Sequence, residues 1–129
     1  MDETRPQVCP ATRVFDLVAH KWTVTILHHL FQARGPVRFR QLQRRVDPIS
    51  QKELTKRLRL LERSGLVSRE VFAEVPPRVE YRLTELGGTL IPALKPLHEW
   101  AETYADLVDA NHRIADAMSS QTHQTESIG

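Results

Sequence analysis

The stretch ISQKELTKRLRLLERSGLV, residues 49–67, decides the fold of this chain. Leucines recur at helical spacing along one side of it, at Leu54, Leu58 and Leu61. The opposite side carries four cations, Lys52, Lys56, Arg59 and Arg63. A helix with this 3.6-residue pattern packs its leucines on a core and presents a line of positive charge on its other face.

Both ends of this helix are marked by local signals. Ser50 and Glu53 form the S-x-x-E pattern of a capping box, in which each side chain accepts a hydrogen bond from the other's backbone N–H. Gly65 is the residue type that most readily adopts the left-handed conformation at a helix C-terminus. The sequence therefore predicts a helix over residues 51–64.

Three shorter helices are predicted before it from their apolar spacing. The first begins at Pro10, the second covers about residues 22–31, and the third covers about residues 39–46. The first helix is expected to bury Val14, Leu17 and Val18. A Gly35-Pro36 turn separates the second helix from the third.

A β-hairpin is predicted after the basic helix. Apolar and polar residues alternate over residues 67–75 and again over residues 79–83, with Pro76-Pro77 at the exposed tip. The fold class is therefore mainly α (α+β), with the element order of a winged helix-turn-helix and a two-stranded β wing. In that motif the helix before the wing lies in the DNA major groove.

The charge distribution supports a polyanionic partner. Residues 34–63 contain ten Lys or Arg and three Asp or Glu, whereas residues 85–129 contain two and seven. Such segregation attracts nucleic acid to the middle of the chain and away from its C-terminal third. No apolar run approaches the roughly 20 residues of a membrane span, and the polar N-terminus lacks a secretory signal. A cytoplasmic protein without membrane contact is expected.

The C-terminal third predicts a helix with a coiled-coil-like seam. From the plausible cap Thr84 onward, apolar residues recur in steps of four and three: Leu90, Leu94, Leu97, Ala101, Tyr104 and Val108. Pro92 and Pro96 are expected to break or kink this helix. The predicted organisation is one domain over residues 1–118, with a recognition helix over 50–64, a wing over 66–84 and a dimer helix over 85–118. Residues 119–129 are expected to be a disordered tail.

The predicted DNA contacts differ along the recognition helix. Base edges are read mainly by the N-terminal part of such a helix, which here carries Ser50, Gln51, Lys52, Thr55 and Lys56. Farther along, Arg59 and Arg63 are placed to contact phosphates. Arg78 at the wing tip is expected to contact the minor groove or the backbone. The double-stranded DNA operator would be read by a homodimer with recognition helices about 34 Å apart.

Five segments resemble the HxlR-type winged-helix transcription regulators of the MarR-like superfamily. They are Cys9-Pro10, KWT at 21–23, RFRQL at 38–42, the opening stretch at 49–67 and VPPRVEYRLTELG at 75–87. The resemblance covers residues 9 to about 104 and implies a bacterial or archaeal homodimer, paired through its C-terminal helix, that binds an inverted-repeat operator and represses or activates nearby genes. A repressor is predicted. The chain departs from the family where Ala19-His20 replaces a frequent pair of glycines.

Cys9 has two interpretations. The resemblance implies that it senses oxidants or electrophiles, and its place before Pro10 at a helix N-terminus favours the thiolate. As the sole cysteine, it excludes an intrachain disulfide, and oxidation would end in a sulfenic acid, a mixed disulfide or a bridge between two copies. Alternatively Cys9 is only a small residue near the dimer interface, and a small-molecule effector bound at that interface gates the regulator.

Other functional classes fit less well. An enzyme built on Cys9 would need a base and an oxyanion site, and the sequence contains no motif for either. A protein-binding adaptor without DNA would need no line of cations on its recognition face. The six histidines lack the spacing of a zinc site, so neither a metal nor a cofactor is expected.

Overall fold

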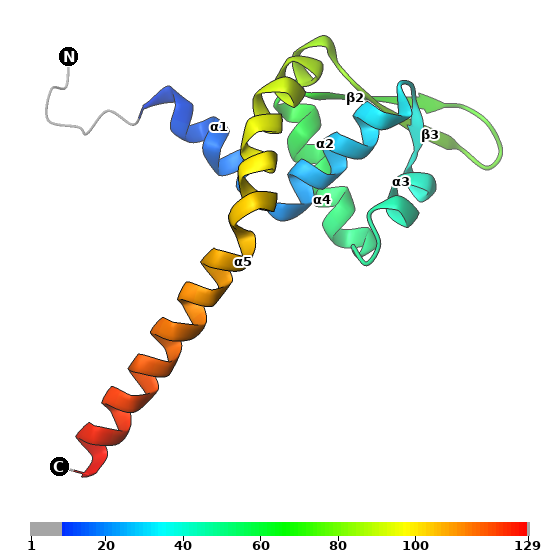
Figure 1. Cartoon of the computed structure of the whole chain (residues 1–129). Helices are drawn as coiled ribbons and strands as arrows, with labels where there is room; N and C mark the ends of the chain where they lie inside the picture. Colours follow the sequence, from blue (N-terminus) through cyan, green and yellow to red (C-terminus); the bar gives the residue numbers. More distant parts are fainter. Residues whose placement is uncertain (1–8, 129) are drawn as a thin grey trace, which may run out of the picture. The chain divides into compact units, whose positions relative to one another are not determined.

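The computed structural model describes residues 9–128, with the side chains of residues 9–121 (Figure 1). The elements in chain order are α1 (Pro10–Val18), α2 (Lys21–Ala33), β1 (Val37–Arg38), α3 (Phe39–Arg45), α4 (Gln51–Arg63), β2 (Val67–Phe72), β3 (Arg78–Leu83) and α5 (Glu85–Ile128). This is the predicted winged helix-turn-helix, with α4 at the position of the recognition helix. The chain divides into two compact units that meet between Ile91 and Pro92, and each is described by itself.

The sheet contains the predicted hairpin and one additional strand. Strands β2 and β3 pair antiparallel, with Val67 opposite Leu83, and β1 pairs antiparallel with β3, with Val37 opposite Tyr81. The strand order is β1-β3-β2. Strand β1 covers two residues, which is too short for an alternating pattern to be visible in the sequence.

The hydrophobic core of the first unit lies between α2, α3, α4 and the sheet. Its buried apolar residues are Ile26, Leu27, Leu30, Val37, Leu42, Val46, Ile49, Leu54, Leu58, Leu61, Leu66, Val67 and Tyr81. Leu54, Leu58 and Leu61 of α4 are at most 1% exposed. The apolar side of α4 is therefore its attachment to the core, as its periodicity predicts.

Helix α1 differs from its prediction in burial. It begins at Pro10 as predicted, but none of its residues is buried in the single chain. Val14 is 47% exposed, and Leu17 and Val18 are half-buried. The expected burial of these residues is wrong for the isolated chain, because α1 packs mainly on α2 and leaves its remaining surface to solvent.

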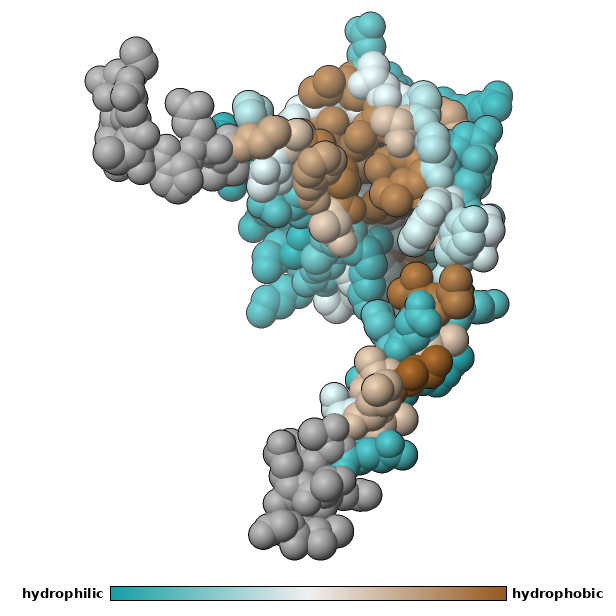
Figure 2. All heavy atoms as spheres, turned by 60° about the vertical axis from the view of Figure 1, so that its left-hand side comes forward, coloured by the Kyte–Doolittle hydropathy of each residue, from teal (hydrophilic) through white to brown (hydrophobic). Residues whose placement is uncertain are grey.

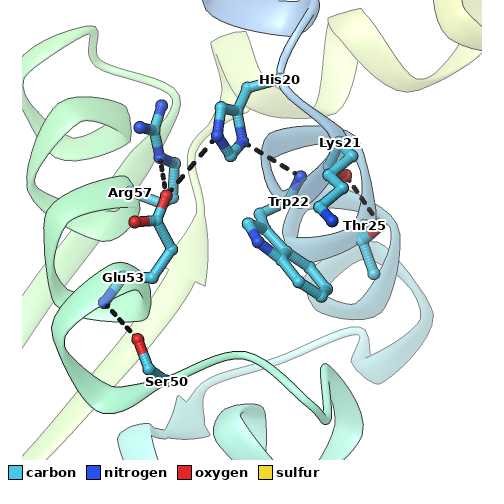
Figure 3. A network of polar contacts seen from close by, with 7 residues as sticks. All are labelled: His20, Lys21, Trp22, Thr25, Ser50, Glu53 and Arg57. Atoms are coloured by element: carbon cyan, nitrogen blue, oxygen red, sulfur yellow. Dashed lines mark hydrogen bonds and ion pairs between the residues drawn. The ribbon is translucent and has the colours of Figure 1, made fainter.

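The N-terminus of α4 forms half of the predicted capping box. The Ser50 hydroxyl accepts a hydrogen bond from the Glu53 backbone N–H over 3.1 Å. The Glu53 carboxylate instead accepts a bond from Nε of Arg57 over 2.9 Å and lies 3.5 Å from His20 (Figure 3). The reciprocal half is displaced because an arginine one turn farther on offers a charged donor.

The C-terminus of α4 closes in a Schellman motif. Gly65 has a φ of +75°, which places it in the left-handed region predicted for it. Its N–H donates to the carbonyl of Glu62 and the N–H of Leu66 donates to the carbonyl of Leu61, each over 3.0 Å. These bonds end the helix and turn the chain directly into β2.

Helix α5 is longer and more continuous than predicted. The Thr84 hydroxyl caps it by accepting a hydrogen bond from the Gly87 N–H over 3.0 Å, as expected. The helix passes through Pro92 and Pro96 without the predicted break and extends past Ser119 to Ile128. Each proline removes only one backbone bond, and the last ten helical residues contain neither glycine nor proline. No helix in the described part of the chain is long and apolar enough to cross a membrane.

Candidate nucleic-acid interface

The outer face of α4 gathers the predicted DNA-contacting residues of that helix. One surface depression is lined by Gln51, Lys52, Thr55, Lys56, Arg59, Leu60 and Arg63. The four cations among them are exposed, whereas Thr55 and Leu60 are half-buried. Ser50, also predicted as a contact, is exposed but its hydroxyl is already used as the cap of α4.

The cations of this face have no carboxylate partners among the described residues. Lys52, Lys56, Arg59 and Arg63 make no ion pair within residues 9–121. Arg57 on the same helix is different, because its side chain is 13% exposed and pairs with Glu53. The helix thus separates one structural arginine from a face of uncompensated positive charge, which is the arrangement that attracts phosphates.

Thr55 is restricted in what it can read. Its hydroxyl donates a hydrogen bond to the Gln51 carbonyl over 2.8 Å, so its proton is engaged within the helix. The hydroxyl oxygen can still accept from a donor on a base edge, and the methyl group can contact a thymine methyl. Lys52 and Lys56 on the same face can only donate hydrogen bonds, so they would contact acceptors on the DNA where Thr55 would contact donors.

Arg78 lies in a different environment from the cations of α4. Its guanidinium lies 3.3 Å from a carboxylate oxygen of Glu74 and 3.3 Å from one of Glu80. It also stacks 4.1 Å from the centroid of the Phe72 ring, and its side chain is 27% exposed. The wing therefore holds the predicted tip contact in two ion pairs, and contact with DNA would require it to exchange these partners.

A polar network lies behind the N-terminus of α4, and sequence reasoning missed it (Figure 3). His20 caps α2, because its Nδ1 accepts a hydrogen bond from the Trp22 backbone N–H over 3.3 Å. Its Nε2 lies 3.5 Å from the carboxylate of Glu53, which also accepts from Arg57. The only sequence signal was the position of His20 just before the start of α2, where capping residues occur.

Helix α5 exposes a wider apolar stripe than the predicted seam. Of the seam, Leu90, Leu94 and Val108 are half-buried, Ala101 is exposed, and Leu97 and Tyr104 are 61% and 43% exposed. Among the described side chains of α5, five large apolar residues outside the seam are also exposed: Leu86, Trp100, Leu107, Ile114 and Met118. Apolar residues interrupt the polar surface of this segment in Figure 2. An apolar stripe of this length on an exposed helix is typical of an interaction surface.

Cys9 is exposed and directly precedes α1. Its carbonyl accepts a hydrogen bond from the Thr12 N–H over 2.8 Å, so the thiol lies on the residue that caps the helix. Arg13, one turn farther on in α1, is an exposed cation on the same helix. The arrangement gives a reagent access to a thiol at a helix N-terminus, where the dipole favours negative charge.

A three-stranded winged sheet, a capped basic helix and an exposed cationic face define a helix-turn-helix protein of the DNA-binding class. The comparison with known families is specific: the family described as HxlR-like helix-turn-helix matches residues 17–109. The chain belongs to this family and is a transcriptional regulator with a helix-turn-helix fold.

Solved structures and curated relatives agree with this assignment. The HTH-type regulator YdeP of Bacillus subtilis is 42% identical over 101 residues, which cover 78% of this chain and 77% of YdeP. The redox regulator HypR in its reduced form is 38% identical, with a TM-score of 0.69 over 79% of this chain and 99% of HypR. The reduced regulator YodB of B. subtilis is 35% identical, with a TM-score of 0.66 over 76% of this chain and 95% of YodB.

Proposed function

We propose that this chain is a homodimeric repressor that binds an inverted-repeat DNA operator through α4, with its affinity gated by modification of Cys9. The observation that carries the DNA-binding part is the line of exposed cations on α4 without carboxylate partners among the described residues. Lys52 and Lys56 lie in the half of the helix that reads bases, and Arg59 and Arg63 contact phosphates. In the complex, phosphates of the operator would pair with the cations of α4 that have no carboxylate partner among the described residues.

The stripe on α5 supports the homodimer. Leu97, Trp100, Tyr104 and Leu107 follow one another in steps of three and four, and each is more than 40% exposed. Ile114 and Met118 continue this spacing after Asn111. Covering apolar surface yields about 25 cal/mol per Å², so a second copy stabilises the helix by packing along it. A polar residue within an otherwise apolar seam fixes the register of two paired helices, which is the role proposed for Asn111.

The position of Cys9 and two relatives support the gate. Cys9 is exposed at the N-terminus of α1, where a thiolate is favoured. HypR is named a redox regulator, and YodB has also been crystallised after diamide treatment. Because Cys9 is the single cysteine, its oxidised forms are a sulfenic acid, a mixed disulfide with a small thiol or a disulfide between two copies.

Fluorescence anisotropy on the DNA upstream of the protein's own gene tests the recognition face. The Lys56→Ala/Arg59→Ala variant should bind more weakly, and its salt slope should fall by about one unit for each phosphate that the variant leaves without a cation. Lys95→Ala removes an exposed cation that belongs to α5 rather than to α4, and this variant should bind like the wild type. Wild-type affinity and slope in the double variant would overturn the assignment of α4.

The same titration with reduced and diamide-treated protein tests the gate. Treatment should weaken operator binding by the wild type and leave binding by Cys9→Ser unchanged. Loss of binding by both proteins would place the effect elsewhere than at the thiol. If diamide changed operator binding by neither the wild type nor Cys9→Ser, Cys9 would not be the sensor. Regulation by a small-molecule effector would then be the remaining alternative.

A further inference from the structure

A second cleft lies at the end of α2 and contains no residue of α4. It has a volume of about 430 Å³, and the end of α2, the following turn, the end of β3 and the first turn of α5 bound it. All of these segments belong to the first compact unit. The volume is within the roughly 300–1,000 Å³ range of small-molecule sites.

The apolar part of the cleft suits a ring. Leu30 is 2% exposed and is anchored in the core, whereas the neighbouring Phe31 leaves 48% of its surface exposed. Leu83 at the end of β3 is half-buried and lines the same cleft. An aromatic side chain beside aliphatic ones packs well against a flat apolar body.

Two arginines make the cleft favour a ligand with negative charge. Arg34 and Arg82 both line the cleft and are both exposed. Neither forms an ion pair with another residue of the described chain. Because a guanidinium offers a planar fork of donors, it matches a carboxylate through two parallel hydrogen bonds. The cleft therefore combines apolar lining with uncompensated positive charge.

Glycines keep the cleft open. Gly35 and Gly88 line it, and a Cβ atom added at either position would meet nothing within 4 Å. Helical Gly88 costs stability relative to alanine, and because it lines the cleft, a large side chain at this position would reduce the cleft volume.

We propose that this cleft binds a small aromatic or alicyclic carboxylate, with its ring against Phe31 and Leu83 and its carboxylate on Arg34 and Arg82. The proposal rests on the function proposed above in naming this molecule an effector of operator binding. The cleft has a route to α4: Thr84 donates through its hydroxyl to the Gly65 carbonyl over 2.5 Å and accepts from the Gly87 N–H. The first turn of α5, which bounds the cleft, is thereby bonded to the end of the recognition helix.

Calorimetric titration of the full chain without DNA tests the site directly. The probes are 1-naphthoate, the neutral 1-naphthalenemethanol and inorganic phosphate. Naphthoate should bind at least about tenfold more tightly than either comparison compound, because only naphthoate has both a ring for the apolar lining and a carboxylate for the arginines. Equal binding of the alcohol would overturn the role of the arginines, and equal binding of phosphate would reduce the cleft to a general anion site and overturn the proposal.

Variants locate the binding. Arg34→Asn/Arg82→Gln should weaken naphthoate binding about tenfold or more, and asparagine tolerates the left-handed backbone of Arg34, whose φ is 55°. Gly88→Leu should abolish binding by filling the cleft. Arg44→Gln, an exposed arginine of α3 outside the cleft, is the matched control and should bind like the wild type. Unchanged affinity in the folded double variant would overturn the proposal.

Anisotropy on the operator separates the two proposals. Naphthoate should shift the wild-type operator affinity and leave that of Arg34→Asn/Arg82→Gln unchanged. Naphthoate binding in a protein that binds no DNA would support the cleft and count against the regulator. Operator binding without any naphthoate binding would overturn the cleft alone.

Discussion

Nε2 of His20 lies 3.5 Å from Oε1 of Glu53, which joins the cap of α2 to the first turn of α4. Because Nδ1 of the same ring accepts the Trp22 N–H, the neutral imidazole carries its proton on Nε2, facing the carboxylate. Glu53 is in turn bonded to Arg57. One side chain therefore contacts both α2 and α4.

His20→Ala should lower the free energy of unfolding by about 1 kcal/mol, because it removes the cap of α2 together with a partner of Glu53. Urea denaturation monitored by circular dichroism measures this change. His112→Ala replaces an exposed histidine on α5 and should leave the first unit unaffected. Equal midpoints for His20→Ala and the wild type would show that the cap and the contact contribute nothing.

Gly87→Ala and Gly88→Ala should have opposite effects on stability although they are neighbours. A Cβ at Gly87 would overlap the carbonyl oxygen of Leu66 and lie 2.9 Å from a methyl carbon of Leu83, so this variant should lose about 2 kcal/mol or more. A Cβ at Gly88 would meet nothing within 4 Å, so this variant should gain about 0.5–1 kcal/mol of helix stability. Thermal unfolding of the pair measures both, and the same sign for both would contradict the close approach of α5 to the end of α4.

The features of the fold that depend on neighbours in sequence were predictable. The start of α4 follows from Ser50 and its end from Gly65, because capping is satisfied within a few residues of the chain. Tertiary partners were not predictable in this way. The Glu53 carboxylate contacts Arg57 and His20 instead of completing the predicted capping box. His20 is within reach of Glu53 only because α2 packs beside α4.

The candidate site shows the same division. The cationic face of α4 follows from helical periodicity, which determines which residues share a side. The ion pairs of Arg78 depend on the register of the wing and on the turn that returns Glu74 to it, and the sequence specifies neither. Likewise the cleft beside Arg34 depends on three elements that meet only in the folded chain.

Stability should decline at mildly acidic pH partly through His29. Burial lowers the pKa of His29 below its ordinary value of 6.5, and the nearby charges of His28 and Arg45 lower that pKa further. The unfolded chain therefore takes up this proton first, so the free energy of unfolding falls as the pH drops from 6.5 through the lower pKa of the folded state. Urea midpoints between about pH 7.5 and pH 5 should fall less steeply for His29→Gln than for the wild type, and parallel curves would contradict this origin.

Charge placed on the apolar stripe of α5 should dissociate the proposed dimer. Leu97 and Leu107 are 61% and 58% exposed in the single chain, so Leu97→Glu/Leu107→Glu need not disturb the core of the first unit. The variant should sediment as a monomer and lose cooperative binding to two half-sites, because a carboxylate buried between two helices has no partner. Ala105→Glu adds the same charge at an exposed position of α5 outside the stripe and should remain dimeric. A dimer that persists in the double variant would exclude this stripe as the interface and direct attention to the exposed surface of α1.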